Sequence, residues 1–186
     1  MRKAGPSLSE RTLSYEPVGM TLATGDWRAG LPGGFRGFER RARLGSSSVW
    51  TFTSNEVLRW GVKTRSGFAV EREGGLPIGP IPDATVVAGA RYWLIAHLGL
   101  LRIREPVQVI AVVDEPDRKG FAYGTLTGHP VSGEEAFLLD RRPDGSVWLT
   151  VRSMTQPSLG IWRATYPLLP VAQTFYRRRY LRSLAS

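Results

Sequence analysis

The chain has 186 residues, a length that fits one domain able to bury most of its apolar surface on folding. Its 42% hydrophobic and 22% charged residues are ordinary for a globular protein, while the absence of cysteine excludes disulfides, thiolate nucleophiles and cysteine metal sites. Two histidines, His97 and His129, are too few for a histidine-rich metal centre, so we expect no metal and no cofactor. The net charge of +9 favours anionic ligands, nucleic acid or membrane surfaces without choosing among them.

The beginning of the chain has no apolar core and predicts no secretory signal. The longest apolar-rich run, Tyr92–Leu101, falls well short of the ~20 residues that a membrane-spanning helix needs. We therefore expect a cytoplasmic protein with a single domain over residues 1–186, of which residues 1–14 are flexible.

The first third of the chain contains few regular elements. Tyr15–Leu22 reads as a short edge strand, and the glycines and proline of Leu31–Gly37 predict a loop. A basic segment from Phe38 to Leu44 leads to three serines at 46–48, one of which can cap a helix that ends near Trp60–Gly61.

Strand-like runs dominate the middle of the chain. The last two are joined by Asp144–Gly145, a strong hairpin signal, and short turns between the others predict an antiparallel meander without βαβ units. Leu76–Pro82 reads as a proline-rich connection. The predicted strands are Gly67–Glu73, Ala84–Leu98, Pro106–Asp114, Gly120–Thr127, Glu134–Asp140 and Val147–Met154.

Both faces of several strands are apolar. Val107, Val109, Ala111 and Val113 alternate onto one face, and Ile110 and Val112 onto the other, so the sheet needs cover on both sides. A sheet that curls around a helix meets this need economically. The sequence therefore predicts an α+β fold in which a curved antiparallel sheet wraps around a long C-terminal helix.

That helix is predicted from about Leu168 to Leu184. An apolar stripe that includes Phe175, Tyr176 and Tyr180 puts Arg177 opposite it and Arg179 near its centre. A buried arginine must find an acceptor. We expect either a salt bridge from Arg179 to Glu134, Glu135 or another carboxylate, or an anion anchor at a cavity mouth.

One stretch, residues 120–137, concentrates the chemically unusual residues. Gly124 inside a strand indicates a bulge, a bend or the close approach of another group. His129 precedes a proline in a turn and is expected at the surface. Glu134 and Glu135 are neighbours on a strand, so they face opposite sides of the sheet and at most one enters the interior.

The sequence of residues 120–137, Gly-Phe-Ala-Tyr-Gly-Thr-Leu-Thr-Gly-His-Pro-Val-Ser-Gly-Glu-Glu-Ala-Phe, resembles the signature of the family called domain of unknown function 1990. Further matches are residues 15–21, 38–60, 109–114 and 173–184, so the resemblance covers nearly the whole chain. It departs from the family where Thr155-Gln156-Pro157 stands in place of an expected Ser-Arg-Pro. The family implies no activity that could be carried over. The order of elements is also similar to the helix-grip fold of START and Bet v 1-like proteins, which implies a cavity for an apolar ligand.

These patterns support a binding module for a small, largely apolar or amphipathic ligand held between the sheet and the C-terminal helix. An apolar interior with a few oriented polar groups is typical of such sites. The candidate ligand-binding residues are Tyr123, His129, Glu134, Glu135, Gln173 and Arg179.

Two alternatives stay open. One is an enzyme that uses His129 with Glu134 or Glu135 as an acid–base pair, although no nucleophile motif or metal spacing is present. The other is nucleic-acid or anionic-surface binding through the arginines of residues 177–182 and of residues 40–43. This second alternative is disfavoured, because the neighbouring aromatic residues lie on the stripe that the core requires.

Overall fold

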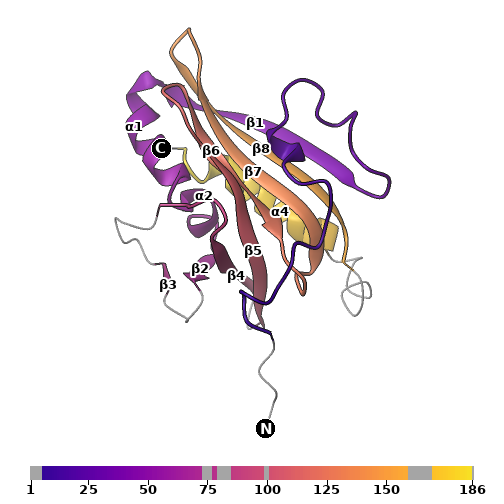
Figure 1. The fold of residues 1–186 in the computed structure, drawn as a ribbon. Coiled ribbons are helices and arrows are strands. Elements are labelled where there is room, and N and C mark those ends of the chain that lie inside the picture. The colour runs from indigo at the N-terminus through magenta and orange to yellow at the C-terminus, as the bar shows by residue number, and fades with distance from the viewer. Residues whose placement is uncertain (1–5, 73–76, 79–84, 99–100, 159–168, 186) are drawn as a thin grey trace.

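A computed structural model describes residues 6–72, 77–78, 85–98, 101–158 and 169–185. Eight antiparallel strands form one curved sheet in the order β1-β8-β7-β6-β5-β4-β2-β3 (Figure 1). The α+β class with a C-terminal helix on the sheet is confirmed. The strands are β1 (Arg36–Ser46), β2 (Ala69–Arg72), β3 (Pro77–Ile78), β4 (Arg91–Leu98), β5 (Leu101–Asp114), β6 (Arg118–Thr125), β7 (Val131–Arg141) and β8 (Ser146–Pro157).

Most strands of the meander follow the predicted runs, and the hairpin signal is confirmed at the β7–β8 turn. Asp144 accepts a hydrogen bond from the backbone N–H of Ser146 at 2.9 Å, and Gly145 takes the positive φ of 78° that the turn requires. This pairing joins β7 and β8 along eleven residue pairs, from Val131 to Arg141 of β7.

Two strands were missed by the sequence analysis. β1 was read as a loop and a basic segment, because Arg36, Gly37 and further arginines hide its alternation. It is an edge strand that pairs through one side with β8, so its charged side chains can remain in solvent. β3 lies inside the stretch that was read as a proline-rich connection.

The alternation predicted for β5 is correct for its first half only. Val107 and Val109 face the main core, but the register shifts between Val109 and Ala111, as in a β-bulge. Beyond the shift Val112 packs on the main core, while Val113 packs on the opposite face. After the bulge, Val112 and Val113 therefore lie on the faces opposite to those predicted by strict alternation.

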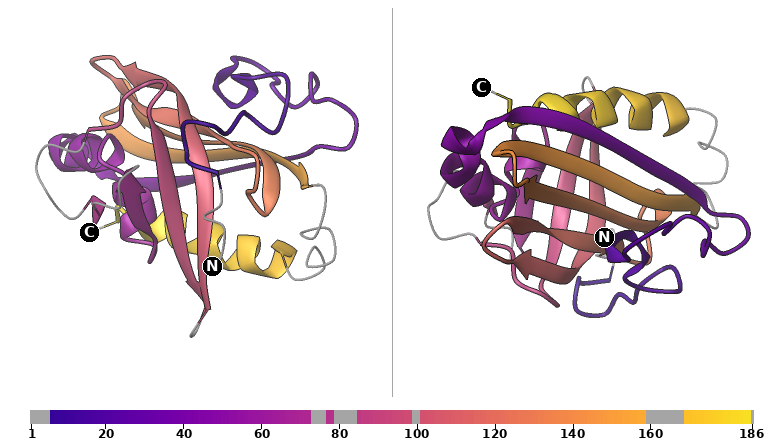
Figure 2. Two further views of the ribbon diagram at one scale, coloured as in Figure 1. Left: turned by 60° about the horizontal axis from the view of Figure 1, so that its bottom comes forward. Right: turned by 90° about the horizontal axis from the view of Figure 1, so that it is seen from above.

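The concave face of the sheet is covered by three helices, α1 (Trp50–Val57), α2 (Gly61–Thr64) and α4 (Leu169–Arg182). Figure 2 shows α4 lying across this face. The helix predicted after the serines is confirmed as a 3-10 turn, Ser47–Val49, that continues into α1. α4 has 14 residues, so the long C-terminal helix of the prediction is a short one.

The predicted orientation of α4 is corrected as well. Tyr176, Tyr180 and Leu184 are buried, whereas Phe175 is 54% exposed and Arg179 is exposed. The half-buried Arg177 donates a hydrogen bond to Ser153 at 3.0 Å and lies 4.0 Å from the centre of the Phe38 ring. The apolar side chains of this helix did not determine its rotation uniquely, because aromatic residues occupy two neighbouring faces.

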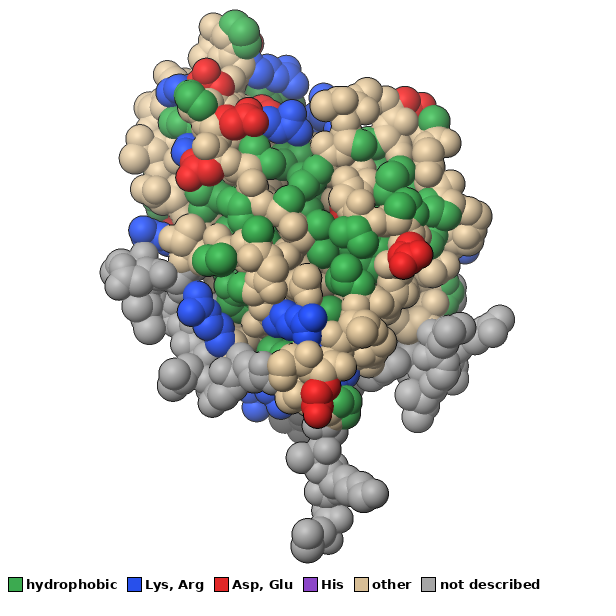
Figure 3. Space-filling view, viewed as in Figure 1, with side chains coloured by type: hydrophobic (Ala, Val, Ile, Leu, Met, Phe, Trp, Pro, Cys, Tyr) green, Lys and Arg blue, Asp and Glu red, His purple; other side chains and the backbone are tan. Residues whose placement is uncertain are grey.

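The N-terminal segment, residues 6–35, lies over part of the convex face, on the side opposite to α4 (Figure 2). The predicted edge strand at residues 15–22 is absent; this part of the chain has bends and a 3-10 turn, Met20–Leu22. Residues 6–14, expected to be flexible, include the fully buried Leu8 and a bridge between Leu13 and Leu126. Hydrophobic side chains remain visible over the middle of this face (Figure 3). None of the helices in the described residues is long and apolar enough to cross a membrane.

Candidate functional site

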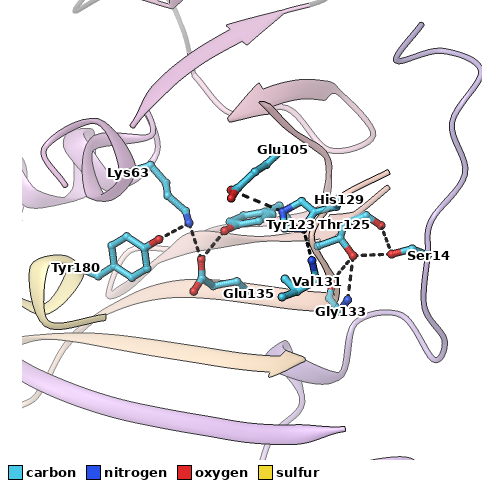
Figure 4. A network of polar contacts seen from close by, with 10 residues as sticks. All are labelled: Ser14, Lys63, Glu105, Tyr123, Thr125, His129, Val131, Gly133, Glu135 and Tyr180. Atoms are coloured by element: carbon cyan, nitrogen blue, oxygen red, sulfur yellow. Dashed lines mark hydrogen bonds and ion pairs between the residues drawn. The ribbon is translucent and has the colours of Figure 1, made fainter. Parts of the chain in front are cut away.

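A group of polar side chains lies inside the concave face, against the aromatic core (Figure 4). Lys63 comes from α2, Tyr123 from β6, Glu135 from β7 and Tyr180 from α4. Lys63 Nζ forms a 2.8 Å ion pair with Glu135 and donates a 2.6 Å hydrogen bond to the Tyr180 hydroxyl. Tyr123 donates its hydroxyl proton to the same Glu135 carboxylate. These contacts tie four elements that are far apart in the sequence.

Aromatic rings surround the Lys63 ammonium, whose side chain is 4% exposed. Its Nζ lies 4.4 Å from the ring centre of Tyr180, 4.5 Å from that of Phe68 and 5.1 Å from that of Tyr123. The negative faces of such rings attract a cation, and Glu135 supplies the compensating charge. The interior therefore holds a fixed positive charge that is both paired and enclosed.

The tyrosines of this cluster act as hydrogen-bonding groups and not as anions. Burial, followed by the charge of Glu135, raises the pKa of Tyr123 and of Tyr180 well above the usual value. Both hydroxyls therefore keep their protons near neutral pH. Since the Tyr180 oxygen accepts the bond from Lys63, its own hydrogen is still available as a donor.

Glu105 of β5 and His129 of the β6–β7 turn form a second pair beside this cluster. His129 Nδ1 accepts a 3.0 Å hydrogen bond from the Val131 N–H, so its proton resides on Nε2, 3.7 Å from the Glu105 carboxyl. Burial and the charge of Lys63 lower the pKa of His129 to about 3, so the imidazole is neutral. Burial raises the pKa of Glu105 to about 7, although Lys63 opposes this. The Glu105 carboxyl therefore titrates near neutral pH.

The two adjacent glutamates of β7 have separate surroundings. Glu135 faces the interior, whereas Glu134 is buried under the N-terminal segment on the other face. Glu134 accepts hydrogen bonds from the Tyr15 hydroxyl at 2.7 Å, the Gly19 N–H at 2.7 Å and the Thr21 N–H at 2.9 Å. The opposite facing expected for the two carboxylates is observed. The expectation that at most one of them is enclosed is wrong, because the N-terminal segment buries Glu134 on the second face and is held on the sheet by it.

Gly124 has one of the features expected for it, the close approach of another group. A Cβ at this position would lie 2.3 Å from the Tyr15 hydroxyl oxygen, which occupies the space above the strand. Gly124 of β6 is paired with Glu134 of β7, so the Tyr15 side chain passes over this glycine to reach the Glu134 carboxylate. Gly124 therefore serves the contact on the convex face.

The other candidate residues are spread over different places. His129, expected at the surface, is 6% exposed, and its close acidic neighbour is Glu105 and not one of the two glutamates proposed as its partner. Arg179 lies on the exposed side of α4, 5.4 Å from the ring centre of Phe175. The side chain of Gln173 lies outside the described residues. The binding roles of these residues, and the predicted cavity, stay predictions.

Sequence reasoning missed Lys63 and Glu105. Glu105 shares its strand parity with Val107 and Val109, which could have placed it on the interior face before the bulge. Lys63 follows the apolar run Trp60–Val62, with Arg59 and Arg65 nearby in the sequence, so nothing local distinguished it from a solvated cation. Its inward direction depends on the left-handed backbone of Trp60, which the sequence pattern does not predict. The described residues contain no group of three or more potential metal-binding side chains.

Sequence comparisons point to one family. A family model described as domain of unknown function DUF1990 matches residues 14–183. A UPF0548 protein of Deinococcus radiodurans is 35% identical over 182 residues, which cover 94% of this chain and 87% of that protein. A UPF0548 protein of Arabidopsis thaliana is 27% identical over 103 residues, which cover 52% of this chain and 50% of that protein.

Similarity to a solved structure is seen at the level of the fold. A hypothetical protein of Helicobacter pylori has a TM-score of 0.54 at 10% identity, covering 85% of this chain and 91% of that chain. The protein Ara h 8.0201 has a TM-score of 0.46 at 13% identity, covering 81% of this chain and 99% of that chain.

Proposed function

The chain belongs to the DUF1990 family, and from the interior of its fold we propose that it binds a small amphipathic molecule between the curved sheet and α4. The polar group of this molecule would lie at Lys63, Glu105 and Glu135, and its apolar body would lie against the aromatic core. One observation carries the proposal. Charged groups converge inside an aromatic interior, and the Glu135 and Glu105 side chains still expose 14% and 18% of their surface.

Stability alone is a poor reason for these charges. A buried ion pair can often be replaced by apolar residues without loss of stability, because removing two charges from water is costly. The cluster also contains unused hydrogen-bonding capacity. Among the described residues, Glu105 has a basic neighbour in His129, which is neutral and lies 3.7 Å away, a distance longer than a hydrogen bond. A bound molecule would supply the missing partner.

The chemistry of the cluster favours a ligand with a hydroxyl or a similar group. Glu105, with a pKa of about 7, can accept or donate a hydrogen bond near neutral pH. The Tyr180 hydroxyl adds a donor, while the charge of Lys63 is already balanced by Glu135. A neutral polar group thus fits this end of the interior better than a second full charge.

The test combines native mass spectrometry with a defined probe. The purified protein is examined for a co-purified small molecule, and 2-naphthol is titrated into the ligand-stripped protein by calorimetry. We expect Glu105→Gln to weaken the affinity for 2-naphthol at least tenfold, since one hydrogen bond to a charged group contributes about 1.5–3 kcal/mol. Glu71→Gln is the matched control, because Glu71 is a similarly buried carboxylate that pairs with Arg102 on another part of the sheet. No bound molecule and no 2-naphthol binding would refute the proposal.

Catalysis is a second candidate, and the Glu105–His129 pair is the observation that favours it. A carboxyl group with a pKa near 7 suits proton transfer at neutral pH, and the fixed tautomer of His129 would orient it. In this reading Glu105 replaces the glutamates first considered as the partner of His129. If a co-purified molecule is turned over, Glu105→Gln should remove turnover while binding persists; unchanged turnover would exclude Glu105 as the acid–base group.

A further inference from the structure

Two polar atoms in the main aromatic core lack hydrogen-bond partners among the described residues. They are Trp60 Nε1 and the Tyr92 hydroxyl, and both side chains have no exposed surface. Native proteins satisfy nearly all buried polar groups, so two such atoms in touching residues require an explanation. The ring centres of Trp60 and Tyr92 are 5.1 Å apart, and the rings meet edge to face.

The backbone at Trp60 indicates that this placement is costly. Trp60 has a φ of 63°, in the left-handed region that a bulky side chain avoids, and it separates α1 from α2. The next residue must be glycine, because a Cβ at Gly61 would lie 2.6 Å from the Glu56 carbonyl oxygen. The turn directs the indole between Tyr92, Phe121 and Tyr123. A backbone strain that delivers an unpartnered donor into the core is typical of a functional site.

We propose that Trp60 and Tyr92 form a second hydrogen-bonding position, which receives an oxygen acceptor from the apolar part of the bound molecule. This inference rests on the proposed function, because the same molecule would contact Lys63 and Glu105 with its other end. An indole N–H can only donate, and a tyrosine hydroxyl can donate as well, so the position selects a carbonyl or ether oxygen. The ligand class is therefore an apolar ketone, ester, lactone or quinone, and not a plain hydrocarbon.

Aromatic packing connects this position to the polar cluster. Tyr123, whose hydroxyl donates to Glu135, lies with its ring centre 5.6 Å from that of Trp60. One molecule of modest length could therefore reach both positions along the same aromatic wall. A buried water molecule is the competing explanation for the two donors. It predicts no preference for a ligand that carries an acceptor.

The experiment compares acetophenone with ethylbenzene, which have similar shapes but differ in the carbonyl oxygen. The readout is the indole N–H resonance of Trp60 in ¹⁵N-correlated spectra, assigned with Trp60→Phe. Acetophenone should move this resonance downfield and bind roughly fivefold more tightly than ethylbenzene, as expected for one hydrogen bond of about 1 kcal/mol. Ethylbenzene should perturb interior resonances without the downfield shift.

Tyr92→Phe tests the second donor. Because the variant removes a hydroxyl that has no partner, it should fold at least as stably as the wild type. It should reduce the preference for acetophenone and leave the affinity for ethylbenzene unchanged. Tyr15→Phe, which removes a hydroxyl on the opposite face, is the control and should leave both affinities unchanged.

The outcomes separate the two proposals. If both compounds bind the interior equally and the Trp60 resonance does not shift downfield, the acceptor position is refuted while ligand binding stands. If neither compound perturbs the interior while 2-naphthol binds, the acceptor position is refuted and the proposed function stands; if 2-naphthol also fails to bind and no molecule co-purifies, both proposals fail.

Discussion

Lys63 is the residue whose surroundings are the most unusual in the described chain, because a lysine with a 4% exposed side chain depends on one carboxylate and on a ring of aromatic groups. Exposed lysines rarely matter to stability, but a buried one that loses its partner leaves an uncompensated charge. Substitutions of Lys63 and of Glu105 should therefore change the free energy of unfolding in predictable directions.

We predict that Lys63→Met destabilises the fold by about 3–5 kcal/mol, since Glu135 is then left without its cation. Adding Glu135→Gln should recover part of this loss, as expected for residues in contact. The matched control is Arg65→Met, which removes an exposed pair with Glu56 and should cost less than about 1 kcal/mol. Urea unfolding of Lys63→Met, Glu135→Gln, the double variant and Arg65→Met measures these differences. Strict additivity of the Lys63 and Glu135 substitutions would contradict the ion pair.

The pH dependence of stability should reveal two opposing titrations. The pKa of Glu105 is raised to about 7, so between pH 4.5 and 7 the folded state binds more protons than the unfolded state, and stability falls as pH rises. The pKa of His129 is lowered to about 3, so between pH 3 and 6.5 the unfolded state binds more protons, and stability rises with pH. The two contributions largely cancel between pH 4.5 and 6.5.

Glu105→Gln should remove the cancellation. The stability of this variant relative to the wild type is expected to increase by up to about 1.4 kcal/mol per pH unit between pH 4.5 and 7. The stability of His129→Gln relative to the wild type should instead decrease as pH rises, so the variant gains most over the wild type at low pH. Unfolding free energies at half-unit intervals of pH measure both. Parallel curves for Glu105→Gln and the wild type would show that Glu105 titrates normally in the folded protein.

Strand β7 carries different contacts on its two faces, and Glu134 and Glu135 are the clearest instance. The sequence determined their opposite orientation, since neighbouring residues of a strand face opposite sides. It could not determine their partners, because Tyr15 and Thr21 lie more than a hundred residues before Glu134, and Lys63 lies far before Glu135. Local periodicity predicted the strands of the meander; contacts between distant segments decided what each face binds.

We predict that Glu134→Gln loosens the N-terminal segment while Glu135→Gln does not. The backbone N–H groups of Gly19 and Thr21 donate to Glu134, so their hydrogen exchange should accelerate when the carboxylate is removed. Glu135→Gln is the matched control one residue further along, on the other face. Hydrogen-exchange mass spectrometry over residues 15–23 measures the difference. Equal protection in the two variants would contradict the role assigned to Glu134.

The elements that the sequence analysis misplaced share a physical cause. β1 is an edge strand with arginines at its exposed positions, so its hydrophobic signal is weak. The rotation of α4 was misjudged because Phe175 and Tyr176 are adjacent aromatic residues, of which only Tyr176 packs against the sheet. In both cases the structure depends on where the neighbouring element lies, and the local sequence does not reveal that position.

At the scale of the whole molecule, one sheet separates two cores that contain different chemistry. The larger core lies under α1, α2 and α4, and the smaller clusters lie beneath the N-terminal segment, around Tyr15, Trp27 and Met154. The need for cover on both faces was predictable from the apolar strands. The segment that packs on the convex face was not predictable, because residues 6–35 contain little regular structure.

We predict that a chain beginning at residue 23 is destabilised by several kcal/mol, since Glu134 loses its donors and the apolar residues around Ala136 lose their cover. In that shortened chain Glu134→Leu should raise stability, whereas in the full chain the same substitution should lower it. Thermal unfolding of the four proteins measures this reversal of sign. A substitution with the same effect in both backgrounds would show that Glu134 does not depend on the N-terminal segment.

A single peptide unit links the carboxylate that fastens the start of the chain to the carboxylate that balances Lys63. Although the two carboxylates are adjacent in the chain, each belongs to contacts on its own face of the sheet, so a substitution at one of them reports on that face. A screen for ligands of the interior can therefore take its unaffected reference from substitutions on the convex face, such as Tyr15→Phe.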